Sequence, residues 1–239
     1  LGADPRLVAI LARDAALAEI DLSRMLFFDT ETTGLAGGTG TLAFLVGLGW
    51  FDEGVLTIEQ LLLPRPGQEG PMLRAVAERI EAASCLVSYN GKSFDWPLLR
   101  TRFVLNRVPA PPPRPHLDLL HCARRVFKRR LGEVRLVHIE EQVLGHRRQT
   151  DVDGAEIPEV YFAYLRGAEG STLVPVLEHN AEDLVALAAL LGTLGERIAT
   201  ICDGDDPRDL LGFAQLSARA GDVDRALGFA RATIRGATD

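Results

Sequence analysis

The sequence predicts an α/β fold in which helices flank a mixed sheet and a helical hairpin follows at the C-terminus. Apolar runs with the pattern of strands come first, and alternating helical and strand patterns follow from residue 69 onward. A change of composition at residues 202–207 separates these elements from two further helical patterns. Strands first, then helices alternating with strands, are typical of a mixed sheet with helices on its faces.

Each element of this fold has its own local pattern. The first strand is expected at Met25–Thr30, where continuous apolar residues lead into a polar run. Residues 69–83 place apolar side chains three and four positions apart, which is the spacing of an amphipathic helix. Five prolines between residues 109 and 115 indicate a stiff connector, and Asp118 in the turn after it either caps a helix or supports a metal site. The other expected elements are a short helix at residues 4–20, strands at 42–51, 55–63 and 85–89, and a helix at 96–105.

The composition is that of an ordinary globular protein, with 47% hydrophobic and 25% charged residues. Its 239 residues are enough for one main domain with an appendage. No apolar run reaches the roughly 18 to 20 residues that a membrane helix needs, so we expect no membrane association. Three cysteines without a short spacing predict neither a disulfide framework nor a zinc site, and a cytoplasmic location is expected. Because the chain starts at Leu1 without a basic and apolar leader, we expect a fragment of a longer protein.

Basic residues are concentrated in one part of an acidic chain. The net charge is −7, yet residues 100–148 hold twelve Lys or Arg and only four Asp or Glu. Such a block attracts phosphate to one face of a protein. The alternative is a solvated helix face that is rich in arginine. The side chains expected to follow a phosphate backbone are Arg124, Arg125, Lys128, Arg129, Arg130, Arg147 and Arg148.

The first polar motif, DTET at residues 29–32, ends the first expected strand. Alternate residues of a strand share a face, so Asp29 and Glu31 lie side by side at the rim of the core. Two carboxylates this close repel each other unless a proton or a cation lies between them. Oxygen ligands of this kind suit Mg²⁺ or Mn²⁺ better than zinc. Taken alone, the pattern is as typical of a solvated strand edge as of a metal site.

The second motif, NGKSFD at residues 90–95, follows the strand at residues 85–89. Its Asn-Gly pair is a turn signal, and Asn90 either contacts a nucleotide or shapes that turn. Asp95 opens the next helix, where it either caps the helix or extends a carboxylate toward Asp29 and Glu31. The aromatic rings of this segment, which either stack on an unpaired base or pack in the core, are Tyr89, Phe94 and Trp96.

The third motif, HNAED at residues 179–183, leads into an apolar helical pattern. His179 and Asp183 are four residues apart and therefore neighbours on one face of a helix. Taken alone, such a pair lies more often on a surface than in a site. The three motifs in this order are much less expected by chance, so together they predict one site with acids from three segments.

The three motifs resemble the exonuclease motifs of the DEDD nuclease superfamily, whose DnaQ-like domain has the ribonuclease H-like fold. The similarity runs from about Met25 to Gly195, and the segments at residues 116–127, 140–148 and 157–167 resemble the YprB-like branch of ribonuclease H-like exonucleases. The resemblance implies a five-stranded mixed sheet within residues 25–202, after a helical lead-in at residues 1–24. One departure concerns His179. The superfamily has either Tyr with three intervening residues before the last Asp or His with four, and this chain has His at the Tyr spacing.

The resemblance implies a two-metal-ion exonuclease that removes nucleotides from a 3′ end, of DNA rather than RNA. Asp29, Glu31, Asp95 and Asp183 are then the ligands of two Mg²⁺ or Mn²⁺ ions, and His179 is the fifth catalytic residue. With an ordinary pKa near 6.5, a histidine is able to take a proton from the attacking water at neutral pH. The expected substrate contacts are Thr30, Thr32, Gly34, Leu35, Asn90, Phe94, Arg124, Arg125 and Lys128.

Residues 207–239 hold two helical patterns around Gly221 and are similar to one tetratricopeptide-like repeat. A single unit of this kind does not bury its own apolar face. We therefore expect it to dock on the nuclease domain, to continue in a longer chain, or to bind a protein partner. Two other functions remain compatible with the sequence: a metal-dependent endonuclease or ribonuclease on the same fold, and a catalytically dead nucleic-acid-binding scaffold. The presence of all four acids favours an enzyme.

Overall fold

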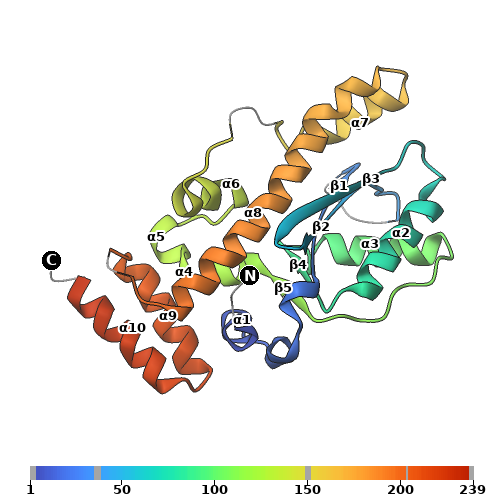
Figure 1. The fold of residues 1–239 in the computed structure, drawn as a ribbon. Coiled ribbons are helices and arrows are strands. Elements are labelled where there is room, and N and C mark those ends of the chain that lie inside the picture. The colour runs from blue at the N-terminus through green and yellow to red at the C-terminus, as the bar shows by residue number, and fades with distance from the viewer. Residues whose placement is uncertain (1–3, 35–38, 149–151, 203, 237–239) are drawn as a thin grey trace.

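A computed structural model of the chain describes residues 4–34, 39–148, 152–202 and 204–236. Its centre is a five-stranded sheet in the order β3-β2-β1-β4-β5, with helices on both faces (Figure 1). This arrangement confirms the predicted mixed sheet flanked by helices. The strands are β1 (Met25–Thr32), β2 (Ala43–Asp52), β3 (Val55–Leu62), β4 (Cys85–Ser88) and β5 (His116–Asp118).

The central strand β1 joins the two halves of the sheet. It pairs antiparallel with β2, which pairs antiparallel with β3. On its other side β1 pairs parallel with β4, and β4 pairs parallel with β5. The expected opening meander is thus confirmed. The structure differs at Asp118, which ends a strand and was expected in a turn, because three residues are too short to show a strand pattern in a sequence.

The helices expected at residues 69–83 and 96–105 are confirmed, whereas the one expected near the N-terminus is divided. The helix expected at residues 4–20 is split, because Arg13 adopts a left-handed backbone conformation (φ 59°, ψ 42°) that ends its first part. The helices are α1 (Pro5–Ala12), α2 (Glu69–Ala82), α3 (Asp95–Leu105), α4 (Leu119–Val126), α5 (Lys128–Leu131), α6 (Leu136–Ile139), α7 (Ile157–Leu165), α8 (Val174–Ala199), α9 (Pro207–Arg219) and α10 (Val223–Gly236). Shorter turns are the 3₁₀ segments Ala15–Glu19, Leu22–Arg24 and Gly170–Leu173 and the π segment Glu140–Leu144.

Two apolar cores lie on the two faces of the sheet. Met25 and Phe27 of β1 pack with α1, α4 and α8, whereas Leu26 and Phe28 pack with α2 and α3. The long helix α8 crosses the sheet on the first of these faces (Figure 1). Alternation along β1 therefore sends successive side chains toward α8 and α3 in turn, and this continues into the polar end of the strand.

The C-terminal hairpin, α9 and α10, is confirmed as a pair of helices and docks on α4. Phe213 of α9 stacks on Phe229 of α10 with ring centroids 5.3 Å apart, and both belong to the same core as α4 and α8. Asp209 is buried at the start of α9, with 2.9 Å to Arg130 Nε and 3.6 Å to Arg197 Nη1. The hairpin thus buries its apolar face against the main body of the protein.

Two further features bear on the expectations from composition. No helix in the described ranges is long and apolar enough to cross a membrane. Among the described residues the three cysteines are free, with Cys85 and Cys122 buried and Cys202 exposed. The chain therefore relies on apolar packing rather than on covalent cross-links.

Candidate active site

The polar end of β1 presents two acids to α8. The side chain of Asn180 on α8 donates a hydrogen bond of 2.9 Å to Oδ2 of Asp29. The Nε2 atom of His179, also on α8, lies 4.0 Å from Oε1 of Glu31. Because alternate residues of a strand share a face, both acids meet the same helix. The predicted pairing of Asp29 with Glu31 at the rim of the core is found in the structure.

The residue between these acids faces the opposite way. The hydroxyl of Thr30 donates a short hydrogen bond to Oδ1 of Asp95. Asp95 lies in the first turn of α3, one residue after the N-cap position, and no side-chain cap bond is formed there. It therefore extends toward β1 rather than capping its helix. The turn before it is tight, since a Cβ atom at Gly91 would lie 2.4 Å from Ser88 Oγ and 3.3 Å from Asp95 Oδ2.

Asp118 holds the loop that carries this turn. Its carboxylate accepts hydrogen bonds from the backbone N–H groups of Asn90 (2.8 Å) and Lys92 (3.2 Å). It also caps α4 by accepting from the N–H of Leu120 (3.1 Å). The expected capping role is confirmed. Asn90 takes a left-handed conformation (φ 66°), as its turn signal predicts.

The fourth acid is held by an arginine from a distant part of the chain. Arg148 Nη2 donates to Oδ1 of Asp183 and lies 2.7 Å from Oε2 of Glu140. The side chains of Arg148 and Glu140 are 4% and 3% exposed, so this ion pair is almost fully removed from water. Arg148 was expected on an exposed phosphate-binding face. That expectation is wrong, because the carboxylates of Glu140, Glu182 and Asp183 bind the guanidinium, whose side chain is almost fully buried.

Arg148 also determines the state of His179. Its Nη1 atom lies 3.3 Å from Nδ1 of the ring. A guanidinium only donates hydrogen bonds, so Nδ1 accepts, and the neutral ring carries its proton on Nε2. That nitrogen lies 3.7 Å from Oδ2 of Asp183. In this arrangement Nε2 is a hydrogen-bond donor that faces the acids.

The electrostatics of the cluster favour a bound cation. Burial raises the pKa of Asp29 well above its usual value, and the charges of Asp183, Glu31 and Asp95 raise it further, against the opposing hydrogen bond from Asn180. Burial also raises the pKa of Asp95, although the hydrogen bond from Thr30 opposes this shift. Carboxylates in this state take up protons or a cation.

The donor set fits a hard divalent ion. Asp29, Asp95 and Asp183 each accept a side-chain hydrogen bond from the protein at one oxygen. Four carboxylates without a thiolate suit Mg²⁺ or Mn²⁺. Within the described residues, no three such groups already converge closely enough to enclose one ion. Side-chain rotation about Cβ would have to complete the shell.

Two hollows border the acids. The first, of about 300 Å³, is lined by five residues that the sequence predicts as substrate contacts, together with Thr41, Asp95 and apolar Leu98. Phe94 in this hollow is 61% exposed, which leaves its ring available. The second, of about 510 Å³, is lined by His179 and Asp183. The predicted contacts in the first hollow are Thr30, Thr32, Gly34, Asn90 and Phe94, whereas Leu35 lies outside the described residues.

The remaining sequence-predicted residues lie elsewhere. The hydroxyl of Tyr89 donates to the carbonyl of Val134, and Trp96 packs at the edge of the core under α2 and α3. Arg124, Arg125 and Lys128 line a separate pocket beside α9 and do not line either hollow. Of the other basic residues, Arg130 pairs with Asp209 (2.9 Å) and Arg147 with Glu141 (3.5 Å).

Three residues of the site were missed in the sequence. Asn180 is fully buried and bonded to Asp29, and its position inside the third motif was a signal for it. Glu140 and Arg148 lie outside all three motifs, so that no local pattern connects them with Asp183. Their role depends on the packing of the segment around residue 140 against α8.

This sheet order, with acids from β1, α3 and α8 gathered at the end of the central strand, defines an α/β protein with the ribonuclease H-like fold. The family model of the RNase_H superfamily matches residues 26–195. The chain belongs to the RNase_H superfamily. The matched region ends before α9, so the C-terminal hairpin lies outside it.

Known proteins resemble the chain in sequence and in fold. The "Uncharacterized protein YprB" of Bacillus subtilis (strain 168) is 40% identical over 178 residues, which are 74% of this chain and 43% of that protein. The chain thus spans less than half the length of this relative. A family B DNA polymerase from the archaeon Pyrobaculum calidifontis matches with a TM-score of 0.57 and 14% identity, over 82% of this chain and 29% of the polymerase. At this identity the match shows the fold alone.

Proposed function

We propose that the chain is a metal-dependent nuclease that removes nucleotides from the 3′ end of DNA. The observation that carries the proposal is that contacts between β1, α3 and α8 bring Asp29, Glu31, Asp95 and Asp183 to the polar end of one strand, where no three of them yet enclose an ion within the described residues. Four neighbouring carboxylates repel one another unless cations lie between them. Bound cations would in turn attract an anionic group, such as a phosphodiester. Membership of the RNase_H superfamily supports a nucleic acid as this target.

The acids would hold two divalent ions between them. Asp29, which feels the charges of the other three acids, would contact both ions, and Glu31, Asp95 and Asp183 would complete the two shells. When bound, such ions lower the pKa of a water and neutralise the charge that develops on the attacking and leaving oxygens. Asn180 and Thr30 hold Asp29 and Asp95 by one oxygen each in the metal-free chain, and binding of the ions would require the acids to move closer together.

His179 is proposed to orient the attacking water through Nε2–H. The contact with Arg148 at Nδ1 places the proton of the neutral ring on Nε2, which makes a donor of the nitrogen that faces the acids. To act as the base expected from the sequence, Nε2 would need a free lone pair. The ring proton would then have to lie on Nδ1, which Arg148 would have to release.

Two substitutions separate these roles of His179. Glutamine keeps an N–H donor but does not take up a proton at neutral pH, so His179→Gln is expected to keep much more activity than His179→Ala. The measurement is the single-turnover rate on a labelled oligonucleotide with saturating Mn²⁺. Equal losses in the two variants, with metal binding retained, would assign the base role to His179.

The hollow beside Asp95 is proposed to hold the terminal nucleotide. Its volume of about 300 Å³, the exposed ring of Phe94 and the neighbouring Leu98 offer an apolar surface to a base. A base stacked on an aromatic ring gains roughly 1 to 3 kcal/mol without regard to sequence. Thr30, Thr32 and Asn90 supply polar groups for the sugar and phosphate.

End-blocked substrates test the direction of attack. We expect a linear single strand to be shortened from its 3′ end, a strand with a blocked 3′ end to resist, and a circular strand to stay intact. Matched DNA and RNA of one sequence then establish the substrate, with faster hydrolysis expected for DNA. Cleavage of the circle would indicate an endonuclease, and faster hydrolysis of RNA would indicate a ribonuclease. Binding without hydrolysis of any substrate would point to a scaffold.

A further inference from the structure

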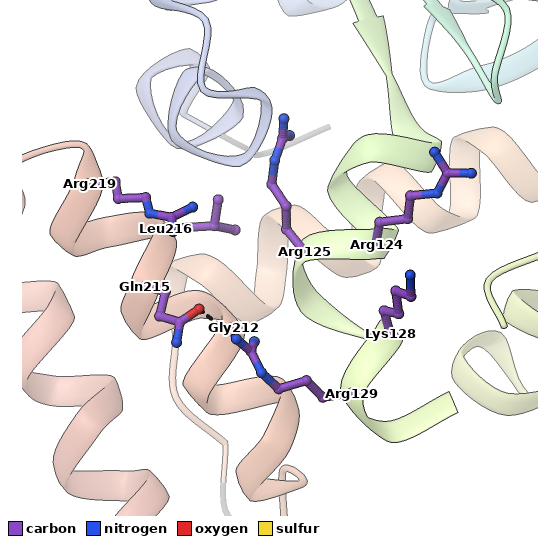
Figure 2. A pocket seen from close by; sticks show the side chains of 8 residues that line it. All are labelled: Arg124, Arg125, Lys128, Arg129, Gly212, Gln215, Leu216 and Arg219. Atoms are coloured by element: carbon purple, nitrogen blue, oxygen red, sulfur yellow. Dashed lines mark hydrogen bonds between the residues drawn. The ribbon is translucent and has the colours of Figure 1, made fainter. Parts of the chain in front are cut away.

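A basic pocket lies between the main body of the protein and the C-terminal hairpin. Figure 2 shows side chains from α4 and α5 on one side and from α9 on the other. Its volume is about 450 Å³, and no acidic residue lines it. The lining residues are Arg124, Arg125, Lys128, Arg129, Gly212, Gln215, Leu216 and Arg219.

The five cations of this pocket have no acidic partner within the described part of the chain. Arg125 donates to the carbonyls of Leu11 (3.2 Å) and Ala12 (3.3 Å). Arg129 donates to Oε1 of Gln215 (2.9 Å), the contact drawn in Figure 2. These partners are neutral and leave the positive charge uncompensated. In a chain of net charge −7, this local excess needs a reason.

Helix ends explain only part of the excess. Arg124 and Arg125 lie in the last turn of α4, and Arg219 lies in the last turn of α9. Cations there stabilise the helix dipole by typically 0.3 to 1 kcal/mol each. Lys128 and Arg129 belong to the four-residue helix α5, where this argument has little force. An anion held between α5 and α9 accounts for Lys128, Arg129 and Arg219.

The chemistry of the lining selects a phosphate backbone. Lys128, Arg129 and Arg219 are exposed, as a groove for a long polyanion requires. The only apolar side chain that lines the pocket is Leu216, so a base finds no aromatic ring there. Contacts of this kind fix the position of a nucleic acid without reading its sequence.

The pocket and the acids are joined by α4. The N-terminus of this helix is capped by Asp118, which also holds the Asn90–Lys92 loop of the site. Its eight residues span about 12 Å, and the pocket lies at its other end. Arg124 turns away from α9 (Figure 2) and is near enough to Tyr89 for its charge to oppose the rise of the Tyr89 pKa. One end of α4 thus borders the loop of the site, and its other end borders the pocket.

We propose that this pocket binds the phosphate backbone of the nucleic acid substrate, several nucleotides from the bond that is cut, and that the C-terminal hairpin supplies one of its walls. The inference rests on the proposed nuclease function for its choice of ligand. It gives the hairpin a role in substrate binding, where the sequence suggested a protein partner as one possibility.

The test compares two variants of equal charge, each with three basic residues replaced in an inactive background. Both carry Asp29→Asn, so that no substrate is consumed. One adds Lys128→Gln, Arg129→Gln and Arg219→Gln in the pocket. The control adds Arg65→Gln, Arg74→Gln and Arg231→Gln, which remove three exposed arginines from other surfaces. Binding of a fluorescent 30-nucleotide single strand is measured by anisotropy over a range of salt concentrations.

The pocket variant is expected to bind the strand about tenfold more weakly, and the slope of log K against log salt is expected to fall by about 2, since each phosphate contact to a single strand contributes about 0.7. The control should bind like its parent. Equal losses of affinity in both variants would mean that binding depends on the overall charge of the protein rather than on the pocket, and would overturn the proposal. No loss in either would overturn it too.

Two further measurements separate the pocket from neighbouring explanations. With Asp29 restored, the ratio of kcat/KM for the 30-mer to that for a tetranucleotide should fall about tenfold in the pocket variant. Inorganic phosphate that displaces the 30-mer at micromolar concentration would instead indicate a site for a small anion and contradict the proposal. If the protein hydrolyses no substrate but its binding still depends on the pocket, the pocket proposal would hold and the proposed nuclease function would be contradicted.

Discussion

Arg148 donates a hydrogen bond to Oδ1 of Asp183 across 35 residues of sequence. The same guanidinium lies 2.7 Å from Glu140 and 3.3 Å from Nδ1 of His179. One buried cation therefore orients the last acid of the cluster and the ring beside it. Its removal should affect both the stability of the fold and the geometry of the site.

The variant Arg148→Met is expected to lower the free energy of unfolding by roughly 3 to 5 kcal/mol, because it leaves the carboxylate of Glu140 buried without its partner. The double variant Arg148→Met with Glu140→Met removes both charges and should recover most of this loss. Urea unfolding at neutral pH measures the two effects. A double variant as unstable as the single one would assign the loss to the contacts of Arg148 with Asp183 and Glu182 rather than to its pair with Glu140.

Asp29 should make the metal-free protein less stable as the pH rises. Its pKa in the folded chain is raised well above the ordinary 3.8, so above about pH 4 the folded state binds more protons than the unfolded state. Stability then falls as the pH increases from 4 through the raised pKa. In EDTA, Asp29→Asn is expected to be more stable than the wild type at pH 7, with little difference at pH 4.

Exposed Glu78 provides the control for this pH dependence. Glu78→Gln should leave the curve of stability against pH unchanged. If the curves of stability against pH ran parallel for the wild type and Asp29→Asn, the pKa of Asp29 would not be raised in the folded chain. Addition of Mn²⁺ should stabilise the wild type more than the variant, because a cation relieves the repulsion.

Gly47 allows Asn180 to reach Asp29. A Cβ atom at this position of β2 would lie 2.1 Å from Oδ1 of Asn180, so Gly47→Ala should displace the amide and cost about 1 to 3 kcal/mol of stability. Gly49 lies two residues further along the same strand, and its added Cβ would meet nothing closer than 3.6 Å. Gly49→Ala is the matched control and should cost little. Thermal unfolding and Mn²⁺ titration of both variants check the prediction, and equal behaviour would contradict it.

Gly212 allows α9 to approach α4 closely. An added Cβ would lie 2.8 Å from Cα of Val126 and 2.9 Å from the carbonyl oxygen of Arg125. Gly212→Ala is therefore expected to destabilise the docked hairpin by about 1 to 3 kcal/mol. Gly192, inside α8, has open space around it, and Gly192→Ala should stabilise the chain by about 0.5 to 1 kcal/mol. Hydrogen exchange in α9 and urea unfolding distinguish the two outcomes.

The sequence was informative wherever a pattern is local. Continuous apolar residues located β1, helical spacing located α2, and a four-residue interval placed His179 and Asp183 on one face of α8. The alternation of a strand was enough to bring Asp29 and Glu31 together. These features depend on neighbours in the chain, so they can be predicted from the sequence alone.

Features that depend on contacts between residues far apart in the sequence could not be predicted. Nothing near Arg148 distinguishes it from the exposed basic residues that precede it, because its partners Glu140 and Asp183 meet it only when the region around residue 140 packs against α8. The three-residue strand β5 exists because β4 offers it a parallel edge. The division of basic residues between a pocket and buried ion pairs likewise depends on the docking of α9.

The most direct test of the account is a gel time course with a single strand of DNA labelled at its 5′ end. The wild type and Asp29→Asn are compared in Mg²⁺, Mn²⁺ and EDTA. We expect the wild type to produce a ladder that shortens from the 3′ end with either ion, and we expect no ladder in EDTA or with Asp29→Asn. Hydrolysis that persists in the variant, or an intact strand in every reaction despite binding, would contradict the assignment of these acids to a metal-dependent nuclease.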